Sequence, residues 1–216
     1  LASDAIAHPP IEALFTIDEE TGMTGALNLK GGLLDGRILL NLDTEDDREL
    51  TIGCAGGVDV TATGSYSLET APEGVLFYEL SVKGATGGHS GMDIYLGRAN
   101  ANKLMNRLLT ATFETCAIQI ASIDGGSLRN AIPRESVAIV IVPESKATEL
   151  ENLVNEKQSI FQAEYQTTDP QLVVSCKKSD SKARVLQKGF QSKLLKSISA
   201  CVNGIYRMSP DILHLV

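Results

Sequence analysis

The sequence predicts an α/β fold in two parts, a short segment of a mixed sheet followed by a ferredoxin-like α+β domain. In the first 55 of the 216 residues, two short apolar runs each end in acidic residues. From about residue 75, the apolar patterns follow the order strand, helix, strand, strand, helix, strand. That order is typical of a sandwich of four antiparallel strands and two helices. We therefore predict domains over residues 1–55 and 56–216.

The two apolar runs are IEALFTI at 11–17 and RILLNL at 37–42. Short runs with little alternation favour strands buried on both faces of a parallel or mixed sheet. Between them, TGMTGALNLKG at 21–31 has room for a short helix, and KGGLLDG at 30–36 predicts a turn into the second strand.

In the second domain, the patterns predict four strands and two helices. The strands are VLFYELSV (75–82), CAIQIASI (116–123), SVAIVIV (136–142) and QLVVSC (171–176), and the helices cover 98–113 and about 145–166. In the second helix, Leu150, Val154 and Phe161 fall on one face at a spacing near 3.6 residues, and Asp169-Pro170 ends the element.

A basic helical pattern over 177–207 follows, with 8 Lys and Arg against one acid. It carries apolar residues from Val185 and Leu186 to Ile198. Such a helix can bind a membrane or an acidic partner, or pack its apolar stripe on its own domain.

Charge is distributed unevenly along the chain. Residues 1–55 hold 11 acidic and 3 basic side chains, whereas residues 56–216 hold 16 of each. Clustered carboxylates repel phosphate backbones and attract cations, so we expect no nucleic-acid partner. The alternative meaning of the cluster is a solvated acidic surface.

Other features point to an ordinary cytoplasmic protein. No apolar run approaches the roughly 20 residues that span a bilayer, and the start LASDAIAHPP lacks the pattern of a secretion signal, so we expect no membrane partner. The four cysteines are tens of residues apart without a CxxC pair, which favours reduced thiols over a zinc knuckle.

Three carboxylates are the first candidates for chemistry. Glu19 and Glu20 follow the first apolar run, and Asp43 follows the second. Adjacent residues leaving a strand point in different directions, so one carboxylate can bind a metal while its neighbour removes a proton from water. Each also has a simpler interpretation, as an acidic helix turn or a capping Asp.

Two loops supply further candidates. His89 lies among glycines in KGATGGHSGMD, where it could donate a hydrogen bond to a developing oxyanion or be an exposed turn residue. SLRNAIPRE offers Arg129, Asn130 and Arg134 between two strands, either to hold a substrate carbonyl or carboxylate or to form a plain connection.

Taken together, the segments FTIDEETGMTGA, NLDTEDD, GCAGGVD, GGHSG and GGSLRNAIPRE resemble the aminoacyl-histidine dipeptidases. These Xaa-His dipeptidases, also called bacterial carnosinase-like enzymes, are cytosolic di-zinc metallopeptidases. The resemblance covers nearly the whole chain. It implies a zinc-binding catalytic domain with a mixed sheet, followed by a ferredoxin-like lid domain that forms a homodimer.

The resemblance also implies roles for individual residues. Glu19 corresponds to the general base, Glu20 to a ligand of one zinc ion and Asp43 to a ligand of the other. His89 corresponds to a lid histidine that reaches a substrate oxygen, across the subunit interface in dimeric relatives. Asn130 corresponds to a lid residue at the same dipeptide substrate.

Some parts of the family pattern fall outside this sequence. The first metal motif would lie before Leu1, and the last histidine ligand and the arginine for the substrate carboxylate would lie after Val216. We therefore expect an internal fragment that neither holds a stable metal pair nor hydrolyses peptides by itself. A related metallo-carboxypeptidase, an amino-acid deacylase and a non-catalytic dimerisation module remain alternatives.

Overall fold

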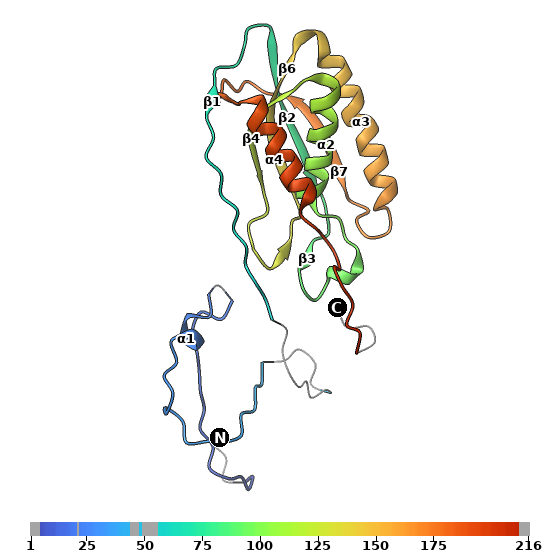
Figure 1. Ribbon diagram of the computed structural model, residues 1–216. Coiled ribbons are helices and arrows are strands. Elements are labelled where there is room, and N and C mark those ends of the chain that lie inside the picture. The colour runs from blue at the N-terminus through green and yellow to red at the C-terminus, as the bar shows by residue number, and fades with distance from the viewer. Residues whose placement is uncertain (1–4, 21, 44–47, 49–55, 212–216) are drawn as a thin grey trace. The chain divides into compact units, whose positions relative to one another are not determined.

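The computed structural model describes residues 5–20, 22–43, 48 and 56–211. It divides into two compact units, Leu1–Gly57 and Val58–Val216 (Figure 1). The GCAGG stretch at 53–57 therefore falls only in part within the described residues.

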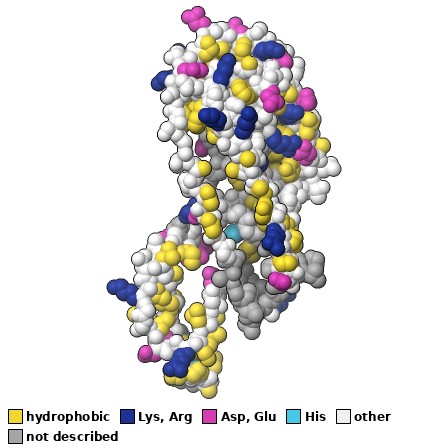
Figure 2. Space-filling view, viewed as in Figure 1, with side chains coloured by type: hydrophobic (Ala, Val, Ile, Leu, Met, Phe, Trp, Pro, Cys, Tyr) yellow, Lys and Arg dark blue, Asp and Glu magenta, His cyan; other side chains and the backbone are white. Residues whose placement is uncertain are grey.

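In the first unit, the predicted strands at 11–17 and 37–42 are wrong. The described residues of this unit form no strand, and Phe15 and Ile38 are 89% and 85% exposed. Figure 2 shows hydrophobic side chains on the surface of this unit. A buried strand needs neighbouring strands and covering layers, which the described residues here do not supply. The short helix is confirmed as α1, Thr24–Leu27.

The second unit is built on a four-stranded antiparallel sheet with the order β4-β6-β2-β7. Of its four strands in chain order, the first and third, β2 and β6, are central. This is the order of the predicted ferredoxin-like sandwich, so this topology is confirmed. The bounds are β2 Val75–Lys83, β4 Gln119–Gly125, β6 Ser136–Pro143 and β7 Val173–Lys178.

Three helices cover this sheet, with α2 lying between α3 and α4 (Figure 1). Their bounds are α2 Ala101–Cys116, α3 Ala147–Glu164 and α4 Lys188–Ala200. The core lies between the sheet and the helices, where Leu80, Leu104 and Phe161 are fully buried. Across the described part of the chain, no helix has the length and apolar character needed to cross a membrane.

A charged pair joins α2 to α3. The Arg107 guanidinium donates two parallel hydrogen bonds to the Glu164 carboxylate, at 2.6 and 2.7 Å, and lies 4.6 Å from the centre of the Phe161 ring. The hydrogen bond from Arg107 lowers the pKa of Glu164, and Glu164 in turn raises the pKa of Arg107. The ion pair links α3 to α2. Both side chains are too exposed for this ion pair to add much to the stability of the domain.

The basic helix packs on its own domain. The Gln191 side chain accepts from the backbone of Ile120 and donates to that of Ile118, at 2.7 and 3.1 Å. From α2, the Lys103 ammonium donates to the last carbonyls of α4, at 2.7 Å to both Ile198 and Cys201. A cation at a helix C-terminus satisfies carbonyls that have no partner within the helix.

The helical pattern in this region is shorter than predicted. Val185 and Leu186 form the strand β8, Val185–Leu186, which pairs with β1, Leu68–Glu69. The helix begins only at Lys188. Two adjacent apolar residues fit the period of a helix as well as that of a strand. Here they form a strand because they pair with residues more than 100 positions away.

Four short elements complete the second unit. The strands β3, Gly88–His89, and β5, Ala131–Ile132, form a separate two-stranded sheet. Two single-turn 3-10 helices, Ile94–Leu96 and Glu144–Lys146, lie before α2 and α3.

Candidate functional site

The small β3-β5 sheet brings His89 and Asn130 together. His89 pairs with Ala131 in the antiparallel ladder, and the Ser90 amide donates to the Asn130 carbonyl at 2.8 Å. Both His89 and Asn130 are exposed. Two residues that lie 41 positions apart in the sequence thus share one edge of the domain.

Hydrogen bonds fix the tautomer of the His89 imidazole. Its Nδ1 atom accepts from the backbone amides of Gly91 and Met92, both at 3.1 Å. A ring nitrogen that accepts carries no proton, so in the neutral ring the proton is on Nε2. His89 therefore presents an N–H donor from the far side of the ring.

The backbone of the His89 loop is also held in place. The His89 amide donates to the Asp93 carboxylate at 2.8 Å, and Arg98 forms an ion pair with the same carboxylate at 3.3 Å. Arg98 also donates to the carbonyl of Gly87 at 2.7 Å. These bonds keep the loop closed around His89.

Gly87 and Gly88 are required by this closed shape. Both have positive φ angles, 70° and 140°. A Cβ atom on Gly87 would lie 2.4 Å from Cγ of Arg134, and one on Gly88 would lie 2.4 Å from Nη1 of Arg98. The glycines thus allow the loop to approach other side chains of the same domain closely.

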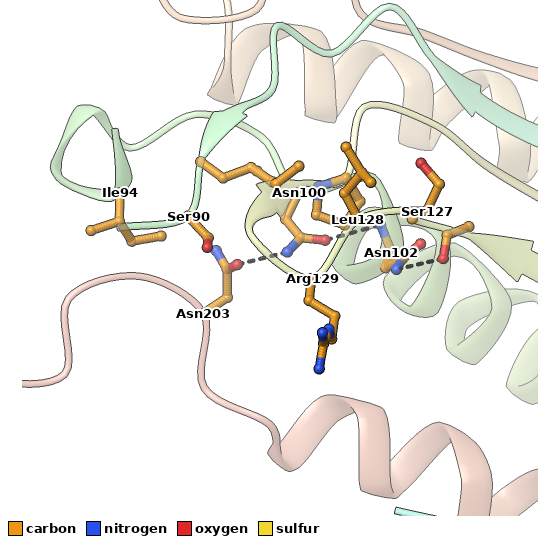
Figure 3. A pocket seen from close by; sticks show the side chains of 13 residues that line it. Ser90, Ile94, Asn100, Asn102, Ser127, Leu128, Arg129 and Asn203 are labelled. Atoms are coloured by element: carbon orange, nitrogen blue, oxygen red, sulfur yellow. Dashed lines mark hydrogen bonds between the residues drawn. The ribbon is translucent and has the colours of Figure 1, made fainter. Parts of the chain in front are cut away.

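Beside this loop lies a cavity of about 400 Å³ (Figure 3). Segments from four places meet there: the His89 loop, the start of α2, the connection between β4 and β6, and the chain after α4. The lining residues are Ser90, Ile94, Asn100, Asn102, Gly125, Gly126, Ser127, Leu128, Arg129, Ala131, Ile132, Pro133 and Asn203. His89 and Asn130 are not among them, although their neighbours Ser90, Arg129 and Ala131 are.

Three asparagines that sequence reasoning missed line this cavity. The side-chain Oδ1 atom of Asn100 caps α2 by accepting from the amides of Asn102 and Lys103. Its Nδ2 atom donates to Asn203 at 2.7 Å, and Asn102 donates to the Gly125 carbonyl at 3.1 Å. An Asn before an apolar helix is a recognisable cap signal. No pattern connects it to Asn203, which lies 103 positions away.

The arginines predicted to hold a substrate have other contacts. Arg129 forms an exposed ion pair with Asp59 at 2.5 Å. Arg134 is exposed, and its side-chain carbons lie against Gly87. Arg129 alone of the two lines the cavity.

The candidate carboxylates lie in the first unit. Glu19 and Glu20 follow Asp18, whose carboxylate accepts from the Thr24 hydroxyl at 2.8 Å, and both are exposed. Asp43 is exposed as well, and its amide donates to the Asn41 side chain at 3.0 Å. Among the described residues, no group of three or more His, Cys, Asp or Glu side chains is placed to hold a metal ion.

Carboxylate oxygens are suitable donors for zinc, but two ligands do not make a metal pair. A di-zinc site needs a bridging carboxylate and several further ligands. The described residues therefore fit the chemistry of such a site in donor type and do not complete it.

Comparison with known proteins identifies the class of the second unit. Residues 80–169 match the family model of the peptidase dimerisation domain. That range covers part of β2 and all of β4 and β6, together with α2 and α3. The prediction of a ferredoxin-like α+β fold for this part of the chain is confirmed.

Two relatives are similar over the whole chain. The cytosol non-specific dipeptidase of Escherichia coli (strain K12) is 38% identical over 210 residues, which are 97% of this chain and 43% of that protein. The crystal structure of aminoacylhistidine dipeptidase from Vibrio alginolyticus matches with a TM-score of 0.78 and 38% identity, over 100% of this chain and 44% of that one. The resemblance to the aminoacyl-histidine dipeptidases is therefore confirmed, and the chain spans less than half the length of these relatives.

Proposed function

We propose that this chain is part of a longer metal-dependent dipeptidase that hydrolyses dipeptides of the Xaa-His type. The observation that carries the proposal is the 38% identity to a cytosol non-specific dipeptidase over 97% of the chain. The name of that relative also supports a cytoplasmic location for this protein.

In the longer protein, the Glu20 carboxylate would bind one of two divalent metal ions and the Asp43 carboxylate the other, and both ions are proposed to be zinc. When bound, such ions polarise a carbonyl and lower the pKa of water. Glu19, adjacent to a ligand and exposed in this chain, is the general base. It takes a proton from the attacking water and passes it to the leaving amine.

The lid supplies the groups that contact the substrate. His89, with its proton on Nε2, donates a hydrogen bond to the carbonyl oxygen as negative charge develops there. Asn130 lies next to His89 through the bond between Ser90 and the Asn130 carbonyl, and its amide side chain holds the same substrate. The cavity of about 400 Å³ beside them lies within the usual size range of small-molecule sites.

A substrate panel on the longer protein tests this function. We expect dipeptides with C-terminal histidine to be hydrolysed, and acyl-amino acids and longer peptides to be poor substrates. Chelation of the metals should abolish hydrolysis. Preference for acyl-amino acids would favour an amino-acid deacylase of similar architecture, and preference for longer peptides would favour a metallo-carboxypeptidase.

The chain alone is proposed to lack dipeptidase activity, since its described residues do not complete a metal site. Its second candidate function is formation of a homodimer through the lid domain, which the family description supports. Sedimentation of the 216-residue chain should then give a dimer whose mass does not change with added chelator. A monomer at every concentration would contradict this role.

A further inference from the structure

Asp169 is a buried carboxylate that sequence analysis treated only as a helix stop. α3 ends five residues earlier, at Glu164, and Asp169 is 1% exposed. Its Oδ1 atom accepts from the Thr86 amide at 2.7 Å, and its Oδ2 atom accepts from the Ala99 amide at 2.8 Å. One side chain thus binds both ends of the segment 86–99.

Several contacts show that Asp169 is ionised and well held. Burial alone raises the pKa of Asp169, but hydrogen bonds from Ala99, Thr86 and Thr168 outweigh it, and the pKa lies below the ordinary value. The Thr86 hydroxyl also donates to the Thr168 carbonyl at 2.7 Å. Hydrogen bonds to a charged, buried acceptor are stronger than neutral ones.

The segment that Asp169 closes is the loop that carries His89. Within it, Asp93 binds the His89 amide, and Arg98 joins Asp93 to Gly87. Asp93 and Arg98 are half-buried, whereas Asp169 is buried and joins the loop to the segment between α3 and β7. The amide of Leu172, just before β7, donates to the Asp169 carbonyl at 3.0 Å.

We propose that Asp169 is a positioning residue for His89: its carboxylate closes the loop 86–99 at both ends and so holds the imidazole donor in place. This inference rests on the proposed dipeptidase function only for its effect on catalysis. Its structural part, the closure of the loop, stands on the geometry of this chain.

Hydrogen exchange of the 216-residue chain tests the structural part. Asp169→Asn offers an amide nitrogen where an acceptor is needed, so one backbone N–H loses its partner. We expect the amides of Gly91 and Met92, which bind His89 Nδ1, to exchange about tenfold faster or more, because the loop opens more easily when one of its anchoring hydrogen bonds is lost. Unchanged exchange at both amides would overturn the proposal.

Two controls separate loop opening from general loss of stability. Asp180→Asn makes the same change at an exposed site and should leave exchange unchanged. Val154→Ala weakens the core of α3 away from the loop and should raise exchange throughout the domain, without singling out Gly91 and Met92. If Asp169→Asn does not fold, Thr86→Val, which removes the hydroxyl that joins the start of the loop to the segment of Asp169, is measured at the same two amides, and unchanged exchange there would overturn the proposal.

A double-mutant cycle in the longer dipeptidase tests the catalytic part. Asp169→Asn should lower kcat/KM in the wild-type background and have little further effect in a His89→Ala background, because it acts through His89. Additive losses would overturn the positioning role and leave the dipeptidase function intact. No loss from His89→Ala itself would instead contradict the proposed role of His89.

Discussion

Replacing Glu19 by glutamine in the longer dipeptidase is expected to leave the bound metal in place and to lower turnover by about 10²- to 10⁴-fold, the usual contribution of a general base. Gln keeps the size and polarity of the side chain but cannot accept a proton at neutral pH. Glu19 is exposed, so its loss should leave folding unaffected. The measurements are metal content and kcat.

Two variants of the same unit make this result specific. Asp35→Asn removes a carboxylate from another exposed position and should keep both metal and activity. Glu20→Gln should lower the metal content together with activity, because its carboxylate is proposed as a ligand. Near-normal turnover in Glu19→Gln would remove Glu19 from the reaction, and loss of metal there would make it a ligand instead.

The second unit could be predicted closely because its elements carry their own signals. Apolar residues form a continuous run through β6 and at the start of β2, and α3 has a clear stripe through Leu150, Val154 and Phe161. The order of these elements admits few topologies, so the observed sheet order follows from it. By contrast, the two residues of β8 depend on a distant partner and were assigned to the helix.

The first unit shows the limit of the same reasoning. An apolar run such as 37–42 records a tendency to be buried, but whether it forms a strand depends on residues that pair with it. In the described structure, the contact between the two halves of this unit is polar: the Glu12 carboxylate accepts from the amides of Asp35 and Gly36, at 3.0 and 2.7 Å. No period in the sequence indicates that bond.

The candidate site was predictable in part for a similar reason. Glycines on both sides marked the His89 loop, and polar residues between two strands marked the connection with Asn130. Asp169, which holds the ends of the His89 loop, lies far away along the chain, and so does Asn203, which binds Asn100 at the start of α2. A single acidic or amide side chain in a loop carries no sequence signal of the amides that it binds.

Three substitutions at His89 are expected to distinguish the role of Nδ1 as an acceptor from the role of Nε2 as a donor. His89→Asn places an oxygen near the position of Nδ1, where it can accept from Gly91 and Met92, but supplies no donor at the position of Nε2. His89→Gln is longer and can place an amide donor near Nε2 while losing the acceptor near Nδ1. His89→Ala removes both groups.

If Nε2 stabilises the developing oxyanion, Asn and Ala should both lower kcat by about 10²- to 10³-fold, the usual cost of removing one such donor. Gln should retain more activity than either. Hydrogen exchange at Gly91 and Met92 should rank the variants differently, with Asn nearest to the wild type, because that measurement depends on the acceptor. Activity equal to that of the wild type in all three variants would show that the imidazole donor takes no part in the reaction. Exchange equal to that of the wild type in all three would show that Nδ1 does not hold the loop.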